Sequence, residues 1–187
     1  MISAVYDACV LYSASLRDFL LRLAEEKLVL PFWSEEIQNE WSRSLLKNRL
    51  DLNPENVKQT RKNMDLHFPD SLVQGYESII PTLTLPDTND RHVLAIAIHV
   101  NAKYIVTFNL DDFPKTILRS YGIEAVSPDE FVQQLFQQFP RPLLLTAKNH
   151  RLSLVRPTKT VGEYLATLEK QGLPMTVAFL REHESDI

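Results

Sequence analysis

The chain has 187 residues, of which 44% are hydrophobic and 24% charged, and its formal net charge is −4. This length suits one domain with a small appendage, and this composition suits a packed core, which excludes an intrinsically disordered chain. The net negative charge excludes a uniformly basic nucleic-acid binder, but it allows a local basic patch.

Cysteine and glycine usage narrows the class of site. Cys9 is the only cysteine, so neither an internal disulfide nor a thiolate metal cluster can form. None of the 4 glycines follows the first predicted strand, which excludes a dinucleotide fingerprint and a P-loop there. The opening stretch MISAVYDACVLYS has no basic residue before its apolar run, and no apolar run reaches about 18 residues. We therefore expect neither a signal peptide nor a membrane span, and a cytoplasmic location.

The amino-terminal residues predict a strand followed by a helix. Residues 2–6 are mostly apolar and stop at Asp7, which is typical of a buried parallel strand with an acid at its carboxyl end. Leucine and phenylalanine then recur at helical spacing, which predicts a helix over residues 11–23.

A second strand and two helices are expected next. Residues 28–32 predict a strand, and Pro31 within it favours an edge position. Ser34 is the expected N-cap of a helix that carries Glu40 beside its apolar stripe. Residues 54–66 predict the following helix.

The stretch Asp87-Thr88-Asn89-Asp90 predicts the start of a buried helix, with Thr88 or Asn89 as its cap. A β-branched strand over residues 104–108 follows, then a loop over residues 109–114.

The last predicted elements of this region are a short strand over residues 124–126 and a helix over residues 128–136. Alternation of strands and helices predicts an α/β protein with a central parallel sheet and helices on both faces. Ligands of such sheets bind at the carboxyl ends of the strands, where Asp7 and the 109–112 loop fall.

The sequence changes character after Pro140. Residues 141–160 contain five basic residues and no acidic residue, and Thr160 with Glu163 then forms a capping-box pattern. A final short helix is expected over residues 175–181. We therefore predict a first domain over residues 1–139 and a helical extension over residues 140–187.

Acidic residues from separate segments are expected at one edge of the sheet. Two unit charges about 5 Å apart repel by roughly 3 kcal/mol at an effective dielectric near 20, so such a cluster needs protons or a cation. Oxygen ligands suit Mg²⁺ or Mn²⁺. Each acid taken alone also has a structural explanation, as a helix cap, a helix-flank charge or a solvated turn residue. The candidates are Asp7, Glu40, Asp87, Asp90, Asp111 and Asp112.

The order of these acids resembles that of the PIN domain family, metal-dependent ribonucleases that include the VapC toxins of bacterial toxin–antitoxin pairs. The resemblance lies in VYDACVLYS, SEEIQNEW, PDTNDRHVLAIAI and IVTFNLDDFP, and it covers roughly residues 1–135. It implies a three-layer α/β/α sandwich and one or two Mg²⁺ or Mn²⁺ ions.

By this resemblance Asp7, Glu40, Asp90 and Asp112 form the catalytic and metal-binding quartet. Thr107 and Asn109 match the polar positions after the strand. Asp87 and Asp111 stay open as alternative or supporting carboxylates. Arg91 and His92 are candidates to contact a substrate phosphate, and solvated helix-turn residues are the alternative for both. We do not expect His92 to bind metal, because no other nitrogen ligand is near it in the sequence.

The predicted function is hydrolysis of RNA phosphodiester bonds by the toxin of a toxin–antitoxin pair. An antitoxin partner and a homodimer are expectations from the resemblance alone. A non-catalytic PIN-fold module that binds RNA or protein is the alternative. A haloacid-dehalogenase-type phosphatase is disfavoured, because Cys9 stands where that class needs a second aspartate. Basic residues at 43–49, 58–62 and 141–160 are candidate RNA contacts.

Overall fold

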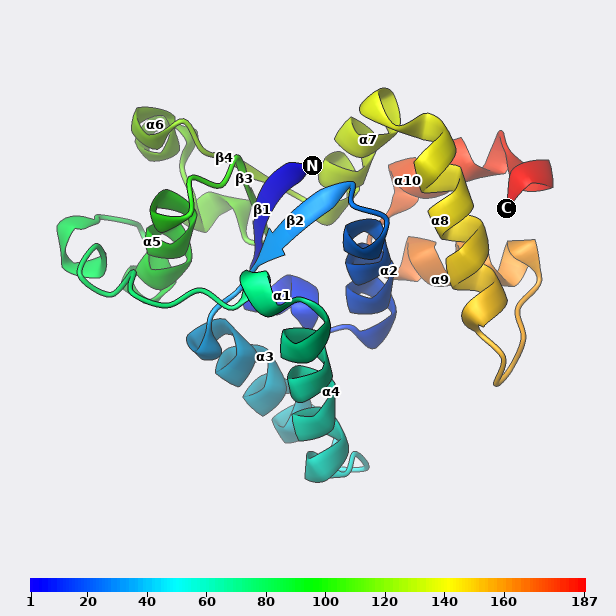
Figure 1. The fold of residues 1–187 in the computed structure, drawn as a ribbon, viewed down its shortest axis with the longest axis horizontal. Coiled ribbons are helices and arrows are strands. Elements are labelled where there is room, and N and C mark those ends of the chain that lie inside the picture. Colours follow the sequence, from blue (N-terminus) through cyan, green and yellow to red (C-terminus); the bar gives the residue numbers. More distant parts are fainter. The chain divides into compact units, whose positions relative to one another are not determined.

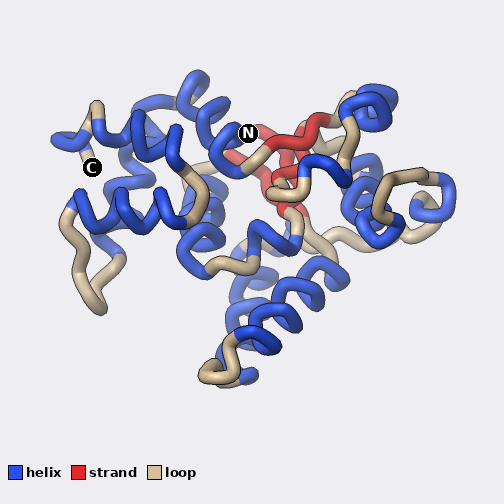
Figure 2. The backbone as a smooth tube through the Cα atoms, turned by 180° about the vertical axis from the view of Figure 1, so that it is seen from behind, coloured by secondary structure: helices blue, strands red, loops and turns tan.

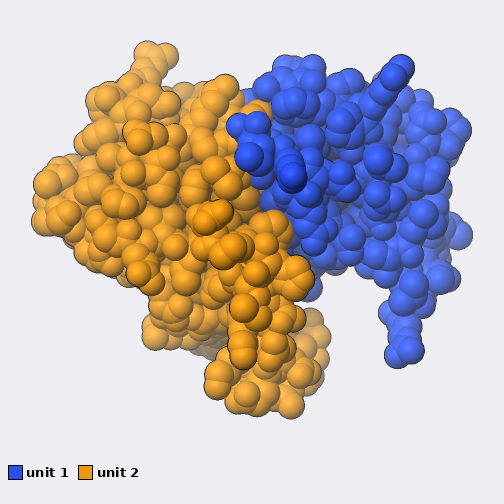
Figure 3. All heavy atoms as spheres, viewed as in Figure 1, with its two compact units in different colours: residues 1, 13–29, 127–187 blue, residues 2–12, 30–126 orange.

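The computed structural model describes residues 1–187 and divides into two compact units (Figure 3). Unit 1 consists of Met1, residues 13–29 and residues 127–187. Unit 2 consists of residues 2–12 and 30–126. Each unit is defined by the contacts among its residues and contains separate segments of the chain. The domain boundary expected after residue 139 therefore remains a prediction.

A four-stranded sheet forms the centre of unit 2 (Figures 1 and 2). Its strands are β1 (Ile2–Tyr6), β2 (Val29–Phe32), β3 (Tyr104–Val106) and β4 (Glu124–Val126), in the order β2-β1-β3-β4. β1 pairs in parallel with β3, and β3 in parallel with β4. The predicted α/β class with a parallel sheet is confirmed, and β2, which contains Pro31, lies at an edge as expected.

The helices of unit 2 connect and cover these strands. They are α1 (Ala8–Leu11), α3 (Glu35–Asn48), α4 (Pro54–His67), α5 (Arg91–His99) and α6 (Lys115–Leu118). α5 packs against β1 and β3, and α3 packs against α1 and α4. Short 3₁₀ turns complete the unit at Pro69–Ser71, Ile80–Thr82, Thr88–Asp90, Leu110–Asp112 and Arg119–Tyr121.

The core of unit 2 is built where α5 meets the sheet. Val93, Leu94 and Ile96 of α5 are 0% exposed, as are Val5 and Ile105 of the central strands. Full burial of one such side chain stabilises a fold by about 1.5–3 kcal/mol. This packing fixes the first turn of α5 against the carboxyl ends of β1 and β3.

Unit 1 is helical. It contains α2 (Ala14–Glu25), α7 (Pro128–Gln138), α8 (Pro140–Ser153), α9 (Val161–Lys170), α10 (Pro174–Arg181) and a 3₁₀ turn at Glu184–Asp186. α8 and α9 both pack against α2, and α10 packs against α7 and α9. The capping box predicted at Thr160 and Glu163 is confirmed, and a second one joins Ser127 to Glu130.

Three local predictions are wrong. The helix expected over residues 11–23 is divided into α1 and α2, because Ser13 is extended and restarts the chain as the N-cap of α2. The N-cap of α5 is Asp90 and not Thr88 or Asn89, because the Asp87 carboxylate first closes a 3₁₀ turn by accepting from Asn89 N at 2.8 Å. The strand expected over residues 104–108 ends at Val106.

The helices are too short or too polar for a bilayer, and none qualifies as a membrane span.

Candidate active site

Asp7 is fixed where β1 ends, beside the end of β3. It is 6% exposed, and its Oδ1 accepts a hydrogen bond of 2.6 Å from Ala8 N. Its Oδ2 accepts from Thr107 Oγ1 at 2.7 Å and from Cys9 Sγ at 3.2 Å. Thr107 Oγ1 in turn accepts from Asn109 N at 3.0 Å. One chain of contacts therefore holds Asp7 at the carboxyl ends of two neighbouring parallel strands.

Asp90 lies within the electrostatic reach of three other acids. Burial raises the pKa of Asp90, and the negative charges of Asp7, Asp112 and Asp87 raise it further, to about 6, with a smaller opposing effect from His92. Asp90 is the N-cap residue of α5, yet its side chain makes no capping hydrogen bond. The structure thus brings together carboxylates from three separate segments of the chain.

A divalent cation fits this set of acids. The donors are carboxylate oxygens, which Mg²⁺ and Mn²⁺ prefer. The negative charges of Asp7, Asp112 and Asp87 add to burial in raising the pKa of Asp90, and a cation would offset the repulsion among these acids. We call Asp7, Asp90 and Asp112 the acidic edge.

The alternative carboxylates occupy different surroundings. Asp112 is half-buried and acts on Asp90, whereas Asp111 is exposed and is not among the charges that shift the pKa of Asp90. Asp87 also acts on Asp90, but it is exposed and its Oδ1 is engaged by Asn89 N. These differences favour Asp112 over Asp111 and make Asp87 a supporting charge.

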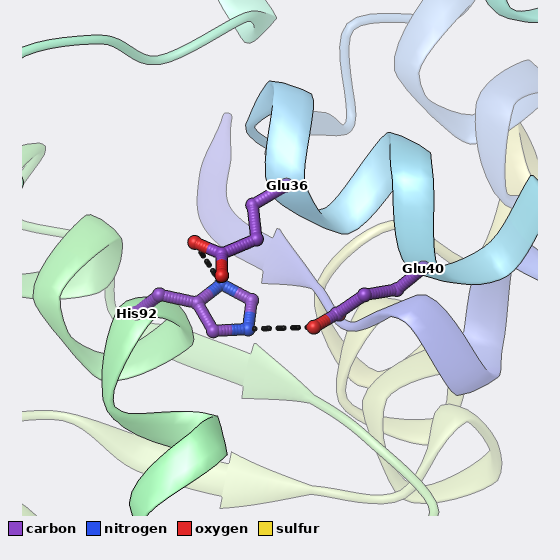
Figure 4. Close-up of side chains that lie close together, drawn as sticks. All are labelled: Glu36, Glu40 and His92. Atoms are coloured by element: carbon purple, nitrogen blue, oxygen red, sulfur yellow. Dashed lines mark ion pairs between the residues drawn. The ribbon is translucent and has the colours of Figure 1, made fainter.

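His92 and Glu40 face each other (Figure 4), and the charge of Asp7 in the acidic edge also acts on His92. His92 is 3% exposed, so it lies inside the protein and not among solvated residues on the first turn of α5. Its Nε2 lies 3.2 Å from Glu40 Oε1, and its Nδ1 lies 3.7 Å from Glu36 Oε2. Burial lowers the pKa of His92, but contact with Glu40 and the charges of Glu36 and Asp7 outweigh burial, so the pKa is raised.

Glu36 is the site residue that sequence reasoning missed. Its position in the first turn of α3 has a local explanation, because the helix dipole favours negative charge there. The available signal was its spacing from Glu40, because residues i and i+4 lie on one face of a helix. Figure 4 shows both carboxylates turned toward the His92 ring.

Several basic residues that we predicted to contact RNA are engaged in local contacts. Arg91 Nε donates to Thr88 O at 2.9 Å. Arg49 pairs with Asp51 at 2.7 Å, and Arg61 pairs with Glu35. In the carboxyl-terminal segment, Arg151 donates to Lys159 O at 3.1 Å. These contacts reduce the number of cations that face solvent without a partner.

Two family models and one curated protein are similar to parts of this chain. The family model described as "PIN domain" matches residues 3–111, and the model described as "VapC50 C-terminal domain" matches residues 128–182. A Mycobacterium tuberculosis protein named "Putative ribonuclease VapC50" is 43% identical over 58 residues, which are 31% of this chain and 34% of that protein. The match thus spans about a third of the length of this curated relative. No solved structure matches the chain.

The two family matches cover different parts of the chain. The match to the PIN domain covers β2, β3, nearly all of β1 and the acids Asp7, Glu40 and Asp90, and it ends one residue before Asp112. The second match covers the helices from α7 to α10. Since the first covers residues 3–111 of 187, more than half of its length, the chain belongs to the PIN domain family and carries a VapC-like carboxyl-terminal extension.

Proposed function

We propose that the chain is a divalent-metal-dependent endoribonuclease that hydrolyses RNA phosphodiester bonds. The observation that carries this proposal is the proximity of Asp7, Asp90 and Asp112, where burial and then the charges of the neighbouring acids raise the pKa of Asp90 to about 6. Repulsion among carboxylates destabilises the folded chain, and it is typical of a site in which a bound cation compensates the charges. The PIN domain match and the name of the mycobacterial relative support the same reaction.

The proposed roles follow from position. Asp7, Asp90 and Asp112 would hold the ion, and Glu40 would complete the site. Thr107 holds the Asp7 carboxylate by its 2.7 Å hydrogen bond, and Asn109 N holds the Thr107 hydroxyl. When bound, the ion supplies positive charge that stabilises the phosphoryl oxygens and favours deprotonation of water.

Hydrolysis requires one oriented water molecule and one leaving oxygen. The water oxygen forms a bond to phosphorus, the bond from phosphorus to the leaving ribose oxygen breaks, and that oxygen gains a proton. Glu40 is 40% exposed in its side chain, so it reaches the solvent from which the water comes. Its contact with His92 would limit its rotation and let it orient the water and accept its proton.

Cleavage of RNA by the purified protein tests this proposal. Wild-type protein should cut RNA in the presence of Mg²⁺ or Mn²⁺ and not in EDTA, and Asp7→Asn should abolish cutting with either ion. Asp111→Asn is the matched control, because Asp111 is exposed and lies outside the acidic edge. Tight RNA binding without metal-dependent cleavage would instead identify a non-catalytic module.

We propose further that this ribonuclease is the toxin of a toxin–antitoxin pair. The match of residues 128–182 to the VapC50 C-terminal domain supports this proposal. Induced expression of the chain should arrest bacterial growth, and Asp7→Asn should remove the arrest. A small protein encoded beside it should restore growth and bind the chain. Arrest by the Asp7→Asn variant would contradict a toxic nuclease activity.

A further inference from the structure

His92 is buried among acids without well-aligned hydrogen bonds. It is 3% exposed, and neither ring nitrogen has an aligned hydrogen-bond partner. A buried polar group normally makes such a bond, because loss of hydration otherwise costs about 1–3 kcal/mol. The ring is nevertheless aimed at two carboxylates of α3, those of Glu36 and Glu40 (Figure 4).

These three side chains have the spacing of metal ligands. One ligand atom from each of Glu36, Glu40 and His92 can be chosen so that all lie within 4.8 Å of one another. The separation of 3.2 Å between His92 Nε2 and Glu40 Oε1 is close to that of two ligand atoms that share an ion about 2.1 Å from each.

We propose that His92 Nε2 and Glu40 together bind a divalent transition-metal ion such as Mn²⁺, and that Glu36 positions the ring. Glu36 Oε2 faces the other nitrogen, Nδ1, at 3.7 Å. A metal-binding histidine commonly donates its second N–H to a carboxylate, which fixes the tautomer and the ring orientation. The inference deepens the proposed nuclease site, and it rests on the assignment of Glu40 to that site.

A nitrogen ligand would change which ions the site accepts. Mg²⁺ prefers oxygen ligands and keeps its waters, whereas Mn²⁺ also prefers oxygen but can accept an imidazole nitrogen, and Zn²⁺ binds imidazole well. The acidic edge offers only oxygen donors, so His92 would be the residue that favours a transition metal over Mg²⁺. Sequence reasoning pointed the other way, because it could not place His92 between two acids.

Pulsed electron paramagnetic resonance of the full chain loaded with Mn²⁺ tests the nitrogen ligand directly. The wild-type protein should show a nitrogen coupling that changes when its histidines are isotope-labelled. His92→Gln should abolish this coupling, and the matched control His99→Gln should keep it, because His99 is exposed. Absence of the coupling from the wild-type protein, or its survival in His92→Gln, would overturn the proposal.

Glu36→Gln separates positioning from ligation. This variant should keep the nitrogen coupling and weaken Mn²⁺ binding about 10–100-fold, as loss of a supporting carboxylate does at other metal sites. Unchanged Mn²⁺ affinity in Glu36→Gln would contradict the positioning role. The wild-type measurement needs no variant, so absence of the coupling overturns the proposal even if His92→Gln fails to fold.

The spectroscopic readout is independent of RNA cleavage. Nitrogen coupling without any cleavage would leave the metal site standing and remove the ribonuclease proposal. Metal-dependent cleavage without nitrogen coupling would support the ribonuclease proposal and overturn the assignment of His92 as a metal ligand.

Discussion

Two buried histidines, one in each unit, have nearly the same exposure and opposite surroundings. His150 in unit 1 is 2% exposed, its Nδ1 lies 3.1 Å from Tyr164 Oη, and its Nε2 lies 3.1 Å from Asp18 Oδ2. His92 in unit 2 is 3% exposed and lacks an aligned partner at either nitrogen. Equal burial therefore does not imply an equal role.

Buried or half-buried aspartates show the same contrast. Asp129 in unit 1 is 4% exposed and accepts hydrogen bonds from Met175 N at 2.8 Å and from Thr176 N and Thr176 Oγ1 at 2.9 and 2.7 Å. Asp90 in unit 2 makes no capping hydrogen bond and is repelled by neighbouring acids. His150 and Asp129 thus join helices of unit 1 through polar contacts, whereas His92 and Asp90 lack aligned contacts of this kind at the candidate active site.

The largest expected effect comes from the two adjacent aspartates of the loop after β3. Asp112→Asn should lower RNA cleavage about 1000-fold, equivalent to about 4 kcal/mol of transition-state stabilisation, because it removes a proposed ligand. Asp111→Asn should stay within about twofold of wild type. Initial rates of RNA cleavage at saturating Mn²⁺ provide the measurement. Equal losses of cleavage in the two variants would contradict the proposal that Asp112, and not Asp111, binds the ion.

The satisfied aspartate should matter for stability and not for chemistry. Asp129→Ala leaves three donors of α10 without their acceptor, so the free energy of unfolding should fall by about 3 kcal/mol. Cleavage per folded molecule should be unchanged. Urea denaturation measures the loss, with the exposed Glu182→Gln as control. If Asp129→Ala lost cleavage and kept full stability, Asp129 would have a role in the reaction and not a structural one.

Thr107 is a hydrogen-bonded polar residue that lies at the candidate active site. Its hydroxyl accepts from Asn109 N and donates to the carboxylate of Asp7 in the acidic edge. Thr107→Val should lower cleavage about tenfold, or about 1.4 kcal/mol, by freeing Asp7 to rotate. Thr107→Ser keeps the hydroxyl and should restore most of the activity. A valine variant as active as the serine variant would show that Asp7 needs no support from the Thr107 hydroxyl.

The smallest expected effect is a gain in stability from removing one repelled charge. The pKa of Asp90 is raised in the folded chain, so the folded state is favoured at low pH and loses stability as the pH rises from about 4 through about 6. In EDTA at about pH 8, Asp90→Asn should raise the free energy of unfolding by roughly 1 kcal/mol, since solvent screens a half-buried charge.

The same comparison at low pH provides the control for Asp90→Asn. Near pH 4 the difference from wild type should shrink toward zero, because Asp90 is then protonated in the folded chain. Mn²⁺ should stabilise the wild-type protein more than the variant. If Asp90→Asn were less stable than wild type at about pH 8 without metal, the Asp90 carboxylate would stabilise the fold more than its repulsion by the other acids destabilises it.

The sequence by itself determined the features that depend on neighbours along the chain. The start of α3 at Ser34, the capping box at Thr160 and the end of β1 at Asp7 each follow from residues within a few positions. The PIN domain family was also accessible from the order of its motifs. Short-range hydrogen bonds and hydrophobic periodicity produce these features. Both depend only on residues that are close together in the sequence, so the features can be predicted from it.

Only the tertiary structure decided which of several equivalent side chains face one another. It separated Asp112 from Asp111, brought Glu36 to His92, and turned His92 inward from a helix turn that could equally face water. The division of residues 8–25 into α1 and α2 was likewise invisible locally. The physical reason is that charge repulsion and burial depend on distances in space, and those distances arise only when α3, α5 and the strand ends pack together.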